Sequence, residues 1–144
     1  MSEPQEVKQE QHGDVLWLTI QREERRNAMN PAVLAAIGEA ITRVNRTREA
    51  AAIVVTGAGS KAFCAGADLQ TGQSFKFDYS EPSQAYANTL RIARASNVPL
   101  IARVNGACMA GGMGLMAMCH MVVAARHAIF GLPEVKVGVF PAQV

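Results

Sequence analysis

The sequence predicts an α/β fold. Its expected strands are apolar along their whole length, as strands covered on both faces are. Segments with helical periodicity separate these strands, which favours helices packed on a mostly parallel sheet. Glycine-rich loops follow two of the strands, so strand, glycine loop and helix occur in that order twice.

Length and composition narrow the class of protein. The chain has 144 residues, which predicts one domain. Its 14 Lys and Arg against 12 Asp and Glu give a net charge of +2, too near neutral to favour nucleic acid or an anionic membrane as partner. With 49% hydrophobic and 18% charged residues the chain is not a disordered tail.

The first half begins with residues 1–13, which are polar and mixed in charge and are expected to be flexible. The ordered domain is expected over residues 14–144. Residues 14–20 alternate as a largely buried strand does. Asn30 is placed as an N-cap with Pro31 at the first helical position, and apolar residues then recur at three and four up to Val44.

The remaining elements are expected in the following order: a strand over 52–56, a glycine loop over 57–72, an exposed stretch over 73–83, a helix from about 86 to 97, a strand over 100–104, a loop over 105–114, a helix over 112–119, a strand over 121–125 and an extended segment over 129–144.

Three cysteines, without a C-x-x-C pair, indicate neither a disulfide framework nor a metal site. Together with a polar N-terminus that lacks a secretory signal, they predict a cytoplasmic location. Residues 107–125 hold a single ionisable side chain, His120, and approach the length of a membrane span. Three glycines interrupt this stretch, so a buried loop, short helix and strand are the better prediction.

The first glycine loop allows two interpretations. Gly57, Gly59 and Ala62 match a dinucleotide-binding fingerprint, with Asp78 at a suitable distance. However, Gly66 interrupts the helix that should follow. The small residues from Ala65 to Ala67 instead leave peptide N–H groups within reach of a ligand.

The second glycine loop, residues 106–112, leads into a helix, whose first N–H groups suit an anion or a developing oxyanion. Two such loops could form a two-pronged oxyanion hole. Tight packing of glycine-rich segments explains the composition equally well, and both interpretations stay open on the residues alone.

Glu134 lies among apolar residues, in FGLPEV, where a carboxylate could serve as a general base. An exposed turn glutamate after a proline is the alternative. Nucleophilic catalysis has little support, because the chain has no G-x-S-x-G motif and the adjacent Cys119 and His120 point apart in regular structure.

Four segments together resemble the crotonase, or enoyl-CoA hydratase/isomerase, superfamily. They are residues 26–30 (RNAMN), 61–69 (KAFCAGADL), 104–112 (VNGACMAGG) and 130–135 (FGLPEV), with Gly138 and Pro141 behind them. The resemblance runs from about residue 14 to the end of the chain.

The resemblance implies a crotonase-like spiral of repeated β-β-α units that binds an acyl-CoA thioester, usually in trimers or hexamers. By position, the N–H groups of Ala67 and Gly111 resemble the oxyanion hole, and Glu134 resembles one of two catalytic carboxylates. The residues that resemble contacts to CoA are Ala28, Lys61, Ala65, Asp68 and Leu69. No cofactor is implied beyond the CoA thioester, which is the substrate.

Two positions depart from the family pattern. Gly114 stands where two-glutamate hydratases carry their first catalytic glutamate, and His120 stands where members commonly carry aspartate. One carboxylate suffices to move a double bond, so the sequence favours an enoyl-CoA isomerase that works through Glu134. Hydration with a single glutamate and a catalytically inactive homologue remain alternatives, and an NAD(P)-dependent oxidoreductase is a distant one. Because family chains usually run nearly twice as long, this chain is expected to lack the C-terminal helical region.

Overall fold

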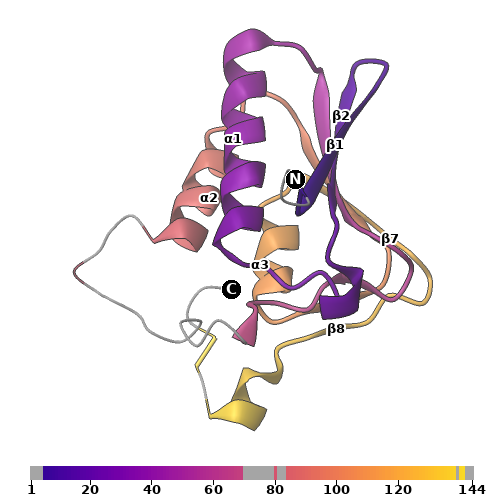
Figure 1. Cartoon of the computed structure of the whole chain (residues 1–144), viewed down its shortest axis with the longest axis vertical. Helices are drawn as coiled ribbons and strands as arrows, with labels where there is room; N and C mark the ends of the chain where they lie inside the picture. Colours follow the sequence, from indigo (N-terminus) through magenta and orange to yellow (C-terminus); the bar gives the residue numbers. More distant parts are fainter. Residues whose placement is uncertain (1–4, 70–79, 81–83, 139, 142–144) are drawn as a thin grey trace.

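The computed structural model describes residues 5–69, 80, 84–138 and 140–141, and in this part of the chain two sheets form (Figure 1). The larger sheet has the strand order β1-β2-β3-β5-β7. Its strands are β1 (Val7–His12), β2 (Val15–Ile20), β3 (Ala52–Gly57), β5 (Leu100–Val104) and β7 (Met121–Ala124). β1 and β2 form an antiparallel hairpin, and every later pairing in this sheet is parallel.

The smaller sheet consists of β4 (Ala62–Cys64), β6 (Ala107–Met109) and β8 (Phe130–Gly131), paired in parallel in that order. Each of its strands follows directly on a strand of the larger sheet. A helical segment then comes after each pair, namely α2 (Ala85–Arg94), α3 (Gly111–Ala117) and the 3-10 helix η3 (Pro133–Val137). The expected α/β spiral of repeated β-β-α units is confirmed.

Helix α1 spans Pro31–Thr47, and residues at both of its ends set these bounds. The Asn30 side chain accepts a hydrogen bond from Val33 N at 2.9 Å, and Pro31 needs no donor at this position. Arg48, with φ +57°, ends the helix in the left-handed region. The buried face of α1, which includes Val33, Ile37 and Val44, joins apolar side chains of β2, β3 and β5 in the main core.

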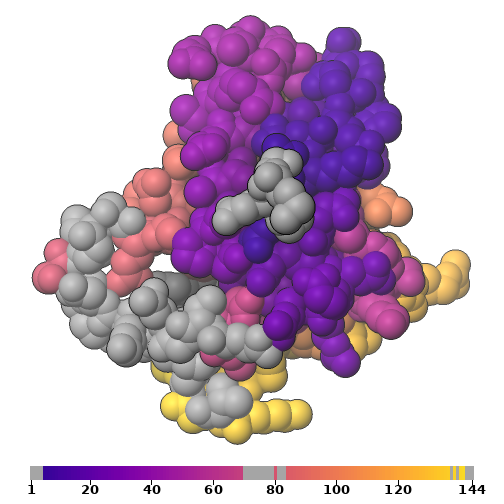
Figure 2. Space-filling view, viewed as in Figure 1, coloured from indigo at the N-terminus to yellow at the C-terminus, as the bar shows by residue number. Residues whose placement is uncertain are grey.

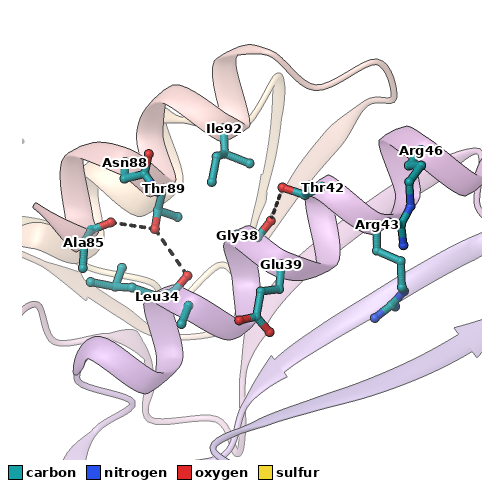
Figure 3. Close-up of a pocket in the computed structure, with 11 residues that line it drawn as sticks. Leu34, Gly38, Glu39, Thr42, Arg43, Arg46, Ala85, Asn88, Thr89 and Ile92 are labelled. Atoms are coloured by element: carbon teal, nitrogen blue, oxygen red, sulfur yellow. Dashed lines mark hydrogen bonds between the residues drawn. The ribbon is translucent and has the colours of Figure 1, made fainter. Parts of the chain in front are cut away.

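Helices α1 and α2 lie side by side (Figure 1). They approach closely at Gly38, where an added Cβ would lie 3.3 Å from Ile92 Cδ1. A groove of about 390 Å³ runs between the two helices, and its lining mixes apolar side chains with Glu39 and Arg43 (Figure 3). No residue expected at the active site lines this groove.

The N-terminal segment differs from its expectation, because residues 7–12 form β1 instead of a flexible stretch. The strand carries a single buried side chain, Val7, so its sequence lacks the alternation of apolar residues from which a strand is predicted. Pairing with β2 across the turn at Gly13, which has φ +58°, holds it in place. Such a polar strand is typical of a sheet edge.

The glycine loops also hold more regular structure than expected, because β4 and β6 form inside them. The last segment, expected to be extended throughout, contains η3, and Glu134 lies on it. The expected strands over 14–20, 52–56, 100–104 and 121–125 and the three expected helices are confirmed to within a few residues. Most of the polar stretch 73–83 lies outside the described residues. None of the described helices is long and apolar enough to cross a membrane.

Candidate active site

The loop that follows β4 packs against the loop that precedes α3. Gly66 has φ +99°, and a Cβ added there would lie 2.8 Å from Ala110 Cβ and 3.3 Å from Gly111 N. Only glycine fits this contact, since both the backbone angle and the space exclude a side chain. The two loops expected to form a two-pronged hole therefore lie against each other.

Two backbone amides lie at the junction of these loops. Met29 pairs with Ala67, and this bridge uses Met29 N, which donates to Gly66 O at 2.7 Å, and Asp68 N, which donates to Met29 O at 2.8 Å. The bridge leaves the intervening Ala67 N–H unused. A Cβ placed on Gly111 would lie 3.8 Å from Ala67 N, so the Ala67 and Gly111 amides are close neighbours.

Neither of these two N–H groups donates a hydrogen bond to any residue that the structure describes. Two neighbouring donors without partners can share one acceptor, such as an oxygen that gains negative charge during a reaction. Two such donors could serve as an oxyanion hole, the role that the family resemblance implies for Ala67 and Gly111, and this role stays a prediction.

Glu134 is brought to the same place by the smaller sheet. Ala110 N donates to Gly131 O at 2.9 Å, which fixes β8 beside the residue that precedes Gly111. Glu134 follows three residues later and is 9% exposed. Its Oε2 is buried and has no hydrogen-bond partner among the described residues. A buried carboxylate oxygen without a donor needs a functional explanation, and a proton acceptor for a bound substrate supplies one.

Sequence reasoning places Tyr86 only on a helix, whereas the structure places it at the site. Its hydroxyl donates to Gly111 O at 2.7 Å. Burial raises the pKa of Tyr86, and the carboxylate of Glu134 contributes to the same shift. No feature of the sequence marks this tyrosine, because the contact joins α2 to α3 across 25 positions of the chain.

Four of the five residues expected to contact CoA are gathered along one short ladder. Ala65 N donates to Arg26 O at 3.1 Å, and the Met29–Ala67 bridge continues the pairing of the two segments. This ladder brings Ala28, which is buried, beside Ala65, Asp68 and Leu69. Leu69 is 57% exposed, and Lys61 is exposed at the start of β4, away from the ladder. Their contacts with CoA stay a prediction.

Asp68 has a structural role that the sequence does not announce. Its Oδ2 lies 2.7 Å from Arg22 Nη2, in a pair whose side chains are 9% and 12% exposed. Arg22 also donates to Ala28 O at 2.6 Å and lies 3.4 Å from Glu6 Oε1. A bonded guanidinium thus ties both sides of the ladder together beside the Ala67 amide.

The dinucleotide fingerprint is wrong. Gly57 and Gly59 are followed by β4, which contains Ala62, whereas a dinucleotide site needs a helix there to receive the pyrophosphate. A Cβ at Gly57 would meet Asn27 Nδ2 and the carbonyl of Phe63, so the protein's own backbone requires this glycine. Asp78 lies outside the described residues.

Two buried asparagines, Asn27 and Asn105, bind the backbone of the loop between β3 and β4. Nδ2 of Asn27 and Nδ2 of Asn105 both donate to Ala62 O, at 2.8 and 3.2 Å. Asn105 also donates to Gly59 O at 2.8 Å and accepts from Gly57 N at 3.1 Å. They hold the connection between β3 and β4, from which the Ala67 prong extends.

Gly114 and His120, the two positions that depart from the family pattern, both have structural roles. Gly114 is buried on α3 and supplies no carboxylate. Nδ1 of His120 accepts a hydrogen bond from Leu100 N at 2.9 Å, so this ring joins the start of β5 to the start of β7. An aspartate could accept the same bond. No group of three or more potential metal ligands occurs in the part of the chain that the structure describes.

Comparison with known proteins identifies the family. A family model described as enoyl-CoA hydratase/isomerase matches residues 10–144. The chain belongs to the enoyl-CoA hydratase/isomerase family. The resemblance stated from four sequence segments is confirmed.

Relatives within the enoyl-CoA hydratase/isomerase family are similar in sequence and in structure. Crotonyl-CoA hydratase of Syntrophomonas wolfei is 36% identical over 125 residues, covering 86% of this chain and 48% of that protein. The structure of EchA1_1 from Mycobacterium paratuberculosis matches with a TM-score of 0.85 at 38% identity, covering 98% of this chain and 54% of that one. Enoyl-CoA hydratase EchA1 from Mycobacterium marinum matches with a TM-score of 0.82 at 34% identity, covering 97% of this chain and 54% of that one. The chain spans about half the length of the curated relatives it matches.

Proposed function

We propose that the chain carries the reaction centre of an acyl-CoA enzyme that moves the double bond of an enoyl-CoA. The observation that supports this proposal concerns the Ala67 and Gly111 N–H groups, which are neighbours and donate to no described residue. They lie beside the segment that bears Glu134, whose buried Oε2 also has no hydrogen-bond partner in the described part of the chain. In this proposal the thioester oxygen accepts both N–H groups. The CoA portion lies along Ala28, Lys61, Ala65, Asp68 and Leu69.

The proposed reaction needs one carboxylate. Glu134 takes a proton from C2 of a 3-enoyl-CoA, and the electron pair of that C–H bond delocalises toward the thioester oxygen to form a dienolate. The two amides stabilise the negative charge on that oxygen. Glu134 then returns the proton to C4, which leaves the double bond between C2 and C3. Protons and electrons balance without a further reactant.

Hydration is the second candidate, because relatives that match this chain are named hydratases. In that reaction Glu134 accepts a proton from water as the water oxygen adds to C3, and it then gives that proton to C2. A second carboxylate would ordinarily help to orient the water, and Gly114 provides none. This difference favours isomerisation for the present chain.

Replacement of Glu134 by Gln tests the proposal. We expect Glu134→Gln to bind a saturated acyl-CoA as the unaltered chain does, because charge on the carboxylate is not needed for binding. Turnover should fall by about 100-fold or more, since general acid–base catalysis typically contributes 10²–10⁴-fold. The assay compares 3-enoyl-CoA with 2-enoyl-CoA, which separates isomerase from hydratase.

Glu39→Gln is the matched control, because Glu39 is an exposed carboxylate on α1. It should leave turnover unchanged. Equal turnover by Glu134→Gln and the unaltered chain would refute the role of Glu134. Thioester binding without any turnover by the unaltered chain would leave a binding protein as the function.

We also propose that the functional protein is a homotrimer or a hexamer, on the strength of the family resemblance alone. Sedimentation analysis would test it.

A further inference from the structure

Tyr86 connects two elements that meet at the candidate oxyanion hole. It lies on α2 with 9% of its surface exposed, and its Oη donates to Gly111 O at 2.7 Å. Gly111 is the first residue of α3, and its N–H is one of the two donors without a partner among the described residues. A side chain from α2 therefore holds the same residue whose amide is available to a substrate.

The backbone before Gly111 is in a conformation that needs support. Ala110 has φ +51° and ψ −129°, a region that residues with a side chain rarely adopt. These angles decide the direction of the Gly111 N–H, because that N–H belongs to the peptide joining Ala110 to Gly111. Met113 N donates a hydrogen bond to Ala110 O, the carbonyl of this peptide, at 2.8 Å. Ala110 N donates to Gly131 O at 2.9 Å, which holds the backbone just before it.

Tyr86 fixes the other side. Its bond to Gly111 O holds the next peptide plane, so Gly111 is held from both directions. In a protein interior a bond of this kind is strong, and loss of the hydroxyl removes one of the hydrogen bonds that hold Gly111 in its orientation.

Tyr86 is also close to the proposed proton acceptor. Burial raises the pKa of Tyr86, and Glu134 is near enough to add to that shift. The phenol consequently stays neutral at physiological pH and remains a donor. It stands at the side of the site where Gly111 and Glu134 converge.

We infer that Tyr86 is a positioning residue of this site, whose hydroxyl aims the Gly111 N–H at the thioester oxygen by holding the Gly111 carbonyl. The inference rests on the proposed function, because it names the device that orients one donor of the proposed hole. It assigns Tyr86 no contact with substrate.

The variant Tyr86→Phe removes the hydroxyl and keeps the ring that fills the space. The probes are two CoA thioesters of equal length, a saturated acyl-CoA and a β-ketoacyl-CoA at a pH where its enolate is populated. The enolate places negative charge at the hole, whereas the saturated acyl-CoA does not. We expect Tyr86→Phe to weaken enolate binding by about 10-fold and to leave binding of the saturated thioester unchanged, since a misdirected donor costs part of the 10²–10³-fold lost with a whole one. In turnover, kcat should fall with little change in KM.

Thr89→Val is the matched control on the same helix. Thr89 is buried, and its hydroxyl lies 2.9 Å from Ala85 O and 3.3 Å from Leu34 O, between α2 and α1 (Figure 3). Its replacement also removes one buried hydroxyl from α2, so it should lower the urea midpoint as Tyr86→Phe does. The ratio of the two thioester affinities should remain that of the unaltered chain.

An unchanged affinity ratio in Tyr86→Phe overturns the inference and leaves the proposed function standing. An equal shift in Thr89→Val also overturns it, because the effect would then follow from general loosening of α2. Failure of the unaltered chain to bind either thioester overturns the proposed function, and the inference with it.

Discussion

Ala110 occupies a backbone conformation that favours glycine. Its φ of +51° and ψ of −129° cost about 1–3 kcal/mol for a residue with a Cβ. The Cβ of Ala110 also packs directly against Gly66, where an added Cβ would lie only 2.8 Å away, so the contact between the two loops has no room for a further atom. Strain at a site loop is typical where the backbone must present a donor.

Replacement of Ala110 by Gly should therefore stabilise the chain. We expect the free energy of unfolding to rise by about 1 kcal/mol, because relief of strain exceeds the added entropy of the unfolded glycine. Urea denaturation measures the change. Ala35→Gly makes the same substitution at an exposed position of α1, where the backbone is helical and unstrained. Its expected effect is opposite, a fall of about 1 kcal/mol in the free energy of unfolding. A loss of stability in both variants would contradict the assignment of strain to Ala110.

The three thiols should be unreactive in the folded chain. Burial raises the pKa of Cys64 to about 12, of Cys108 to about 11 and of Cys119 to about 12. At pH 8 all three are therefore protonated, and only a thiolate attacks a disulfide reagent. We expect little labelling by an aromatic disulfide reagent at pH 8 and labelling of all three thiols after unfolding in guanidinium. Rapid labelling of one thiol in the folded chain would contradict this expectation.

At the scale of elements, β7 is an edge strand with an apolar surface. Its four residues are exposed, with Met121 59% and Val123 61% exposed, and no strand covers its outer side in the described part of the chain. The opposite edge, β1, is polar. Exposed apolar side chains continue beyond β7 at Phe130 and Val135. The C-terminal segment, yellow in Figure 2, reaches the lower edge of the molecule in that view.

The β7 edge should make the isolated chain associate. An apolar edge strand offers unpaired backbone groups and apolar side chains to a second molecule, whereas a lysine on the edge opposes such pairing. We expect Val123→Lys to reduce the mass seen by light scattering at high concentration, with a change in the free energy of unfolding of no more than about 0.5 kcal/mol. Ala51→Lys adds the same charge at an exposed position outside the strands and should leave the mass unchanged. Equal masses for Val123→Lys and the unaltered chain would show that this edge does not associate.

The elements differ in how far their sequence predicts them. α1 carries a cap, a proline and a regular apolar face, and each acts within a few residues, so its bounds are predictable. β3 and β5 are short apolar runs, which buried parallel strands require. β4 and β6 are three residues long and exist because they pair with each other across distant segments, which no local pattern encodes. β1 forms by pairing with β2 despite its polar composition.

At the scale of the whole molecule, the spiral brings three distant loops to one point. Each β-β-α unit advances the chain by one strand in both sheets, so the ends of β4, β6 and β8 are neighbours. Ala67, Gly111 and Glu134 follow these three strands in turn. The resemblance proposes these three residues for the site. The contacts of Tyr86 with Gly111 and of Arg22 with Asp68 join segments far apart in the chain, so no local pattern in the sequence predicts them.

The buried asparagine between β5 and β6 has a consequence for how this protein ages. Asn105 precedes Gly106. Deamidation of an asparagine begins when the next backbone nitrogen attacks the side-chain amide carbon, and a glycine in that position hinders the attack least. Here that amide is bonded to Gly57, Gly59 and Ala62, and a Cβ at Gly106 would already meet the backbone of Lys61, so the backbone has no room to form the cyclic intermediate. Folding thus protects the side-chain amide of Asn105, which is open to attack in the unfolded chain. The fraction of Asn105 that is deamidated in a stored sample should therefore rise with the time that its molecules have spent unfolded.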